Sequence, residues 1–211
     1  MSLIPFSLTP FSLTPITPFA VLAGWFTWTL AEYVFHRFGM HQAKGKGLAS
    51  REHLKHHADR DSVLEKWALS WGGVLLVGIG LGVVLTPAFG VGWVLGYGFY
   101  DWQHYQAHRR APRNRYQRWV RRHHFHHHFG HPMANHCVTW PLWDKVFGTY
   151  EQPGAIRVPR RMAMVWLLDE DGEVRPEHAA DYAVVGRVRR DEVSARADLV
   201  AAYANQAPAL V

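Results

Sequence analysis

Ten of the fifteen histidines in this chain fall into four clusters, and the spacing within most of the clusters is that of one helix face. Residues three or four apart lie on the same side of a helix, so their rings can point at one ion. Neutral imidazole is the commonest metal ligand in proteins and binds zinc, iron, copper and nickel. The fold must therefore bring four distant segments together around metal. The clusters are His36 with His41; His53 with His56 and His57; His104 with His108; and His124 with His127 and His128.

The spacings predict a site for two ions. Adjacent residues on a helix diverge by about 100°, so neighbouring histidines such as His56 and His57 can serve different ions. His36 and His41 are five residues apart, a step that turns about 140° past a full turn of an ideal α-helix. Their rings converge only if the helix ends or bulges between them. Gly39 lies in that gap, and glycine tolerates such a distortion, which predicts a local unwinding there.

Other interpretations of the histidines carry less weight. A lone histidine such as His178 is interpreted as a surface or hydrogen-bonded residue. The run 123–128 resembles an affinity tag or a low-complexity metal-binding tract, but it lies in mid-chain beside three other clusters. The single Cys137 rules out an internal disulfide and a thiolate zinc framework.

Three segments predict helices in a membrane. Residues 67–85 form a run of nineteen without a charge, close to the roughly 20 that cross a bilayer. Residues 16–35 are charged only at Glu32, and residues 91–100 continue a third segment after the turn signals at 86–90. A buried helix of a soluble protein could explain any one of these, but together they favour a membrane protein. Tryptophans near the segment ends fit interfacial belts: Trp67, Trp71, Trp93 and Trp102.

The charge distribution predicts the topology. No Lys or Arg precedes Arg37, whereas residues 37–66 and 109–122 are rich in both. The positive-inside rule places the N-terminus outside and both basic stretches in the cytoplasm, so all four clusters emerge on one membrane face. The arginines of 109–122 are interpreted as contacts to anionic lipid headgroups, not to nucleic acid. The expected fold is an all-α integral membrane bundle with a cytoplasmic histidine-rich metal-binding cap.

We expect three regions along the chain. Residues 1–15 are a Pro-rich lead-in with a near-repeat, and residues 16–150 are the membrane-embedded region that carries the histidines. Residues 151–211 have mixed charge, with a helix expected around 191–204, and are interpreted as a cytoplasmic tail or dimer contact without visible chemistry.

The four histidine motifs, in this order, resemble those of the fatty acid hydroxylase superfamily, which includes sterol desaturases, sterol C4-methyl oxidases and fatty acid 2-hydroxylases. Residues 141–150 (PLWDKVFGTY) are similar to the family's closing Trp-Asp-x-x-Phe-Gly-Thr signature. The resemblance covers about residues 20 to 150. It implies a mostly helical membrane enzyme, expected in the cell inner membrane with its site facing the cytoplasm. Two histidine-bound iron ions would use O2 and two electrons to hydroxylate or desaturate a C–H bond of a lipid.

The resemblance also implies the ligand set. His123, His126 and His127 fit the spacing of the fourth motif as well, but the family's distances to His108 and Trp143 favour the register that starts at His124. His136 stands where relatives usually carry an aromatic residue and is left out of the set. The expected ligands are His36, His41, His53, His56, His57, His104, His108, His124, His127 and His128.

Groups that orient the ligands and deliver electrons are also expected. Carboxylates near the motifs, and the histidine beside the fourth, are candidates to fix imidazole tautomers: Glu32, Glu52, Asp59, Asp101 and His123. No flavin, haem or dinucleotide fingerprint is visible, so electrons are expected from a separate ferredoxin or cytochrome b5-like donor. Zinc can replace iron in purified protein, because zinc stands higher in the affinity order.

Two rival functions remain open. A carotenoid hydroxylase has similar motifs, but its third histidine pair is one residue wider than that of His104 and His108. A non-catalytic zinc- or nickel-binding membrane protein is the other rival, although carriers keep their ligands inside the membrane segments. Which lipid is oxidised, and whether the product is an alcohol or an alkene, is not determined by these motifs.

Overall fold

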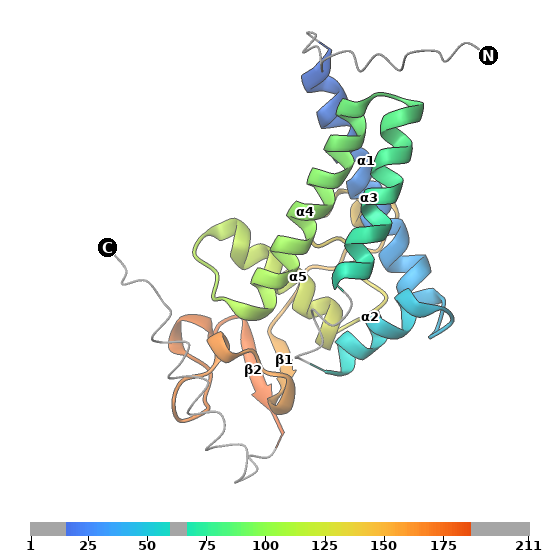
Figure 1. The fold of residues 1–211 in the computed structure, drawn as a ribbon. Helices are drawn as coiled ribbons and strands as arrows, with labels where there is room; N and C mark the ends of the chain where they lie inside the picture. The colour runs from blue at the N-terminus through green and yellow to red at the C-terminus, as the bar shows by residue number, and fades with distance from the viewer. Residues whose placement is uncertain (1–15, 60–66, 187–211) are drawn as a thin grey trace, which may run out of the picture.

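The computed structural model describes residues 16–59 and 67–186 and is mostly helical (Figure 1). Three long helices form its upper part: α1 (Thr17–Val34), α3 (Trp67–Val84) and α4 (Pro87–Arg109). Below them lie the π-helix η1 (Phe35–Gln42), α2 (Leu48–Ala58) and α5 (Arg115–Phe129). The helices that carry histidines therefore gather at one end of the bundle.

Glycines allow the long helices of the bundle to touch. A Cβ atom at Gly24 would lie 2.1 Å from the carbonyl oxygen of Phe89, and one at Gly92 would lie 2.0 Å from that of Val21. No side chain fits at such distances, so α1 and α4 pack backbone against backbone. The α3–α4 turn is closed by Thr86, whose Oγ1 accepts from the N–H of Phe89 at 3.2 Å as the N-cap of α4.

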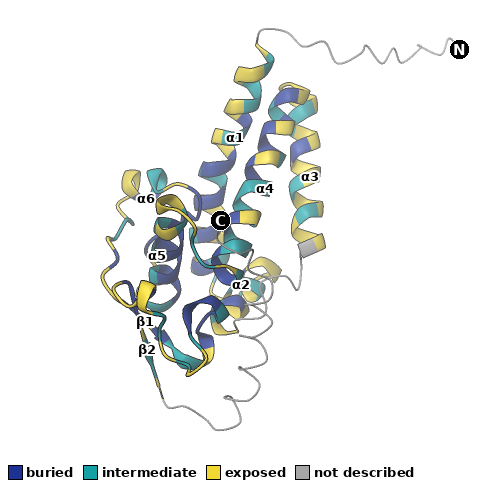
Figure 2. Ribbon diagram, turned by 90° about the vertical axis from the view of Figure 1, so that its left-hand side faces the viewer, coloured by how far each residue is buried: buried dark blue, intermediate teal, exposed yellow. Residues whose placement is uncertain are grey.

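The outer faces of α1, α3 and α4 expose large apolar side chains, as the yellow bands on these helices show (Figure 2). The most exposed on these helices are Phe19, Leu22, Leu76, Ile79, Val83 and Val84, at 65% to 82%. Across residues 16–59 and 67–186, no helix combines the length and apolar character of a membrane span. The third predicted segment, 91–100, lies within α4, which begins at Pro87 and continues to Arg109.

The buried guanidinium of Arg121 fixes α5 against the end of α4. It donates to the carbonyl oxygens of Arg110 and Gln106 at 2.8 Å and to that of Gln117 at 3.1 Å. Arg110 and Gln106 lie at the C-terminal end of α4, so this one side chain bonds α5 to that end of the helix. This contact sets the angle at which the histidines of α5 face those of α4.

The region after Tyr150 packs against α5, and this corrects the all-α prediction. β1 (Ile156–Pro159) pairs in parallel with β2 (Tyr182–Val185), with Ile156 opposite Tyr182. Short α6 (Leu142–Val146) and three 3-10 turns, 160–162, 165–167 and 176–178, complete the described part of the chain. Trp166 is fully buried in the core under α5 and donates to the carbonyl of Ala107 at 3.1 Å. The predicted lead-in 1–15 and the predicted helix 191–204 lie outside the described residues.

Candidate metal centre

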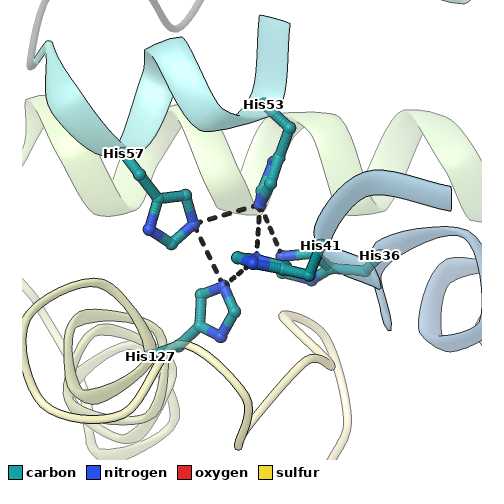
Figure 3. Close-up of side chains that lie close together, drawn as sticks. All are labelled: His36, His41, His53, His57 and His127. Atoms are coloured by element: carbon teal, nitrogen blue, oxygen red, sulfur yellow. Dashed lines mark hydrogen bonds between the residues drawn. The ribbon is translucent and has the colours of Figure 1, made fainter. Parts of the chain in front are cut away.

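The ten predicted ligand residues form two groups of five, each with its ligand atoms within 4.8 Å of one another. The first cluster, drawn in Figure 3, is His36, His41, His53, His57 and His127. The second cluster is His56, His104, His108, His124 and His128. The two clusters together draw on four separate segments of the chain, three for each cluster.

Helices α2 and α5 each contribute to both clusters, as the divergence of adjacent helix residues predicts. His57 belongs to the first cluster, while its neighbour His56 belongs to the second. His127 and His128 are divided in the same way, and the rings of His57 and His128 stack with their centroids 4.0 Å apart. The two clusters are therefore immediate neighbours.

The first histidine pair converges because residues 35–42 form a π-helix. A π-helix bonds residue i to residue i+5, so His36 and His41 lie about one turn apart, with ring centroids 5.2 Å from each other. The predicted bulge, a local unwinding of the helix, is thus present as a widened π-helical turn. A Cβ atom at Gly39 would meet only the Phe35 side chain at 3.8 Å, so the widened turn does not require glycine.

The ring nitrogens of the first cluster converge as ligands of one cation would. The Nε2 atom of His41 lies 2.9 Å from that of His127 and 2.8 Å from that of His53. In the second cluster, the Nε2 atoms of His104 and His56 are 3.0 Å apart, and those of His108 and His124 are 2.8 Å apart. Nitrogens about 2.0–2.1 Å from one ion and at right angles to each other would be about 3 Å apart. His36 and His127 donate through Nδ1, so their Nε2 atoms carry no proton and each has a lone pair that can bind metal. The donor set therefore fits two metal ions.

Burial keeps these imidazoles neutral. Loss of hydration lowers the pKa of His41 and of His104 to about 4, and the pKa of His57 to about 3. The other seven are shifted in the same direction by the same first cause. Neutral imidazole is the form that binds metal, so the site is ready to accept ions at neutral pH.

Backbone carbonyls of the loop 134–139 orient two ligands of the first cluster. The Nδ1 atom of His127 donates to the carbonyl of Ala134 at 2.8 Å, and that of His36 donates to the carbonyl of His136. Such bonds fix the tautomer, point Nε2 at the ion and make the ligand more basic. Sequence reasoning assigned this role to carboxylates and to His123, because a backbone acceptor leaves no trace in the side-chain pattern.

The four predicted carboxylates have different surroundings. Buried Glu32 accepts hydrogen bonds from the backbone N–H groups of Val138 and Thr139, and from the hydroxyl of Thr139, so it holds the end of the same loop. Asp101 accepts from the indole N–H of Trp71 at 3.2 Å. Glu52 lines a cavity between α1, α2, α3 and α4, and Asp59 follows the last turn of α2.

His123 lies outside both clusters and bonds to Asp144. Its Nε2 atom donates to Asp144 Oδ2 at 3.1 Å, and both side chains are 0% exposed. Asp144 also accepts from the N–H groups of His136 and Cys137 and from the hydroxyl of Thr149. Sequence reasoning did not select Asp144, although it is the aspartate of the Trp-Asp-x-x-Phe-Gly-Thr signature in residues 141–150.

The remaining histidines have other settings. His136 is buried beside the first cluster, with its ring 5.4 Å from that of His36, and its Nε2 atom donates to the carbonyl of Met133. His126 and His131 both contact the carboxylate of Glu151. His178, predicted as a surface or hydrogen-bonded residue, is not on the surface, because it is buried against the ring of Trp166.

A cavity of about 540 Å³ lies between α1, α2, α3 and α4 and reaches both clusters. His53 of the first cluster and His56 and His104 of the second line one part of it. Most of the remaining wall is apolar and includes Trp28, Phe35, Met40, Leu69, Val74, Val77 and Trp93. An apolar molecule in this cavity would therefore lie against histidines of both clusters.

Known proteins are similar to this chain in sequence. A dihydroceramide fatty acyl 2-hydroxylase of Arabidopsis thaliana is 33% identical over 140 residues, which cover 61% of this chain and 59% of that protein. A ceramide very long chain fatty acid hydroxylase of Schizosaccharomyces pombe is 32% identical over 151 residues, which cover 63% of this chain and 44% of that protein. The chain thus spans about half the length of these relatives.

A solved structure of full-length scs7p, in which only the hydroxylase domain is visible, has the same fold. It aligns with a TM-score of 0.54 and 24% identity over 65% of this chain and 57% of that chain. The resemblance stated from the motifs is confirmed, because residues 21–149 match the fatty acid hydroxylase family. This chain belongs to the fatty acid hydroxylase family.

Proposed function

We propose that this chain is a membrane-bound, non-haem di-iron oxygenase that hydroxylates a C–H bond of a lipid acyl chain, using O2 and two electrons. The observation that carries the proposal is the pair of adjacent five-histidine clusters, which open onto one apolar cavity. Membership of the fatty acid hydroxylase family supports the reaction class. The names of the relatives, fatty acyl 2-hydroxylases, favour hydroxylation over desaturation.

The ten clustered histidines would hold the two irons, five to each ion. When bound, the irons supply the redox chemistry that activates O2 and oxidises the C–H bond. The carbonyls of Ala134 and His136 keep the Nε2 atoms of two imidazoles free of protons, and burial keeps the other rings neutral. The residues around the cavity exclude water from the reacting centre.

The cavity supports a lipid as the substrate. Its apolar wall runs from Trp93 and Val77 to the histidines at His56 and His104, so an acyl chain can lie along it with one carbon close to both clusters. Each buried methylene contributes about 0.8 kcal/mol to binding, which favours long chains. Glu52 and Asp101 form part of the polar wall near the histidines.

Membrane attachment is also part of the proposal. The exposed apolar side chains on α1, α3 and α4 support contact with lipid, and the basic stretches at 37–66 and 109–122 support an orientation with the histidines toward the cytoplasm. We propose the cell inner membrane as the location. Electrons would come from an external ferredoxin or cytochrome b5-like protein.

The proposal is tested with purified protein in detergent. We expect about two metal ions per chain by elemental analysis, and zinc can occupy the site after overexpression. Iron-loaded protein, given an electron donor and O2, should add one oxygen atom to a ceramide or fatty acid, as detected by lipid mass spectrometry. Metal-free protein is the control. One ion or none in folded protein would exclude a dinuclear centre, and two irons without oxidation of any lipid would favour a non-catalytic metal-binding protein.

A further inference from the structure

Asp144 is the centre of a buried hydrogen-bond network on α6. Its Oδ1 atom accepts from the N–H of His136 at 2.8 Å and from Thr149 Oγ1 at 2.8 Å. Its Oδ2 atom accepts from Cys137 N–H at 2.9 Å and from His123 Nε2 at 3.1 Å. Two of these four donors are backbone groups of the loop 134–139, so the carboxylate fixes the path of that loop.

The same loop holds ligands of the first cluster only. Its carbonyls at Ala134 and His136 accept the Nδ1 protons of His127 and His36. In the second cluster, by contrast, three buried Nδ1 atoms have no hydrogen-bond partner in the described part of the chain: those of His56, His124 and His128. The two clusters are alike in their ligands and unlike in what orients those ligands.

We infer that Asp144 is the positioning residue of the first cluster and that the metal in this cluster depends on it, while the metal in the second cluster does not. Asp144 acts through the backbone of His136 and Cys137, which sets where the loop carbonyls meet the imidazoles. Loss of a partner bonded directly to a ligand typically weakens metal binding about 10–100-fold, and this sets the range expected when Asp144 no longer holds the loop that bears two such partners. The inference rests on the proposed function in one respect, that the clusters bind metal.

Zinc binding by purified full-length chain tests the inference, with Asp144→Asn and Asp144→Ala as the variants. Asn keeps an acceptor for His136 N–H and Thr149, so Asp144→Asn should lower the affinity for one of the two zinc ions about 10-fold. Asp144→Ala removes every acceptor and should lower that affinity about 100-fold. Asp181→Asn is the matched control. Asp181 is also a buried carboxylate, but it pairs with Arg118 and Arg122 on the outer side of α5.

Two ligand variants assign the weakened ion to a cluster. His41→Ala removes a ligand of the first cluster, and His108→Ala removes one of the second. His108→Ala leaves zinc in the first cluster, and adding Asp144→Asn should lower the affinity for that zinc about 10-fold. His41→Ala leaves zinc in the second cluster, and adding Asp144→Asn should not change the affinity for that zinc. General destabilisation would weaken both ions equally, so this difference separates positioning from a merely structural role.

Equal weakening in both backgrounds, or no weakening in folded protein, would overturn the inference. If Asp144→Asn does not fold, Thr149→Val removes a single donor to Oδ1 and should weaken the same ion by a smaller factor. The zinc measurements need no substrate. A protein that shows the selective loss but oxidises no lipid would therefore support the inference while contradicting the proposed reaction.

Discussion

The exchange of His124 or His123 for alanine tests the ligand register. His124 lies in the second cluster, with its Nε2 atom 2.8 Å from that of His108, whereas His123 points to Asp144. We expect His124→Ala to remove one metal ion and to abolish lipid oxidation. His123→Ala should keep two ions, with weaker binding in the first cluster through Asp144.

The expected size of the effect follows from ligand linkage. At a free metal concentration 100 times Kd, one filled site stabilises the fold by about 2.7 kcal/mol. In a chain of 211 residues, 1 kcal/mol corresponds to about 2–4 °C in Tm, so loss of that site removes about 5–11 °C of metal-dependent stabilisation. His123→Ala instead leaves buried Asp144 with one donor fewer, which costs about 1–3 kcal/mol whether metal is present or not.

The assay compares Tm with and without zinc for both variants and for the unchanged chain, together with the metal content of each. The unchanged chain and His123→Ala should both show a large rise in Tm on addition of zinc, and His124→Ala a clearly smaller one. If His123→Ala abolishes metal binding while His124→Ala retains two ions, the reasoning fails. The ligands of α5 would then be His123, His126 and His127.

Three further outcomes are expected. Burial lowers the pKa values of His41, His57 and His104 to about 4, 3 and 4, whereas histidine in the unfolded chain has a pKa of about 6.5. Below pH 6.5 the unfolded state therefore binds more protons than the folded state. The metal-free protein should therefore lose stability as the pH falls from about 6.5 to 4, as measured by denaturant unfolding, and a flat profile would contradict the burial argument. Val74→Trp should fill the cavity and suppress lipid oxidation while both ions stay bound, so loss of metal instead would show that Val74 supports the clusters. A cysteine at Leu85, at the end of α3 far from the histidines, should be labelled from the outer side of the membrane when Cys137 is replaced by Ser, and cytoplasmic labelling would contradict the proposed topology.

Sequence alone could predict which histidines share a helix face, because that spacing is a local property of the backbone. It also predicted that the triplets in α2 and α5 would divide between two ions. It could not say which ring joins which cluster, because that depends on the angles at which α2, α4 and α5 meet. The π-helix at 35–42 is the predicted bulge, but the hydrogen bond of His36 to a loop one hundred positions further along the chain has no local signal in the sequence.

The parts that sequence reasoning missed are long-range or lack periodicity. The acceptors for His36 and His127 are main-chain carbonyls, which every residue carries, so no side-chain pattern marks them. The region after Tyr150 builds its core from Trp166 and its neighbours through two short strands and single 3-10 turns. These elements are too short to show a helical or alternating repeat.

That late region has a consequence for how the protein matures. Every histidine of both clusters has been synthesised once the chain reaches His128, but the core that backs α5 is completed only by Trp166 and Tyr182. A nascent chain that already holds all ten imidazoles therefore lacks the core that packs behind α5, the helix of His124, His127 and His128. Ions should enter after synthesis of this region, and copies cut short before Trp166 should stay metal-poor and be open to proteolysis.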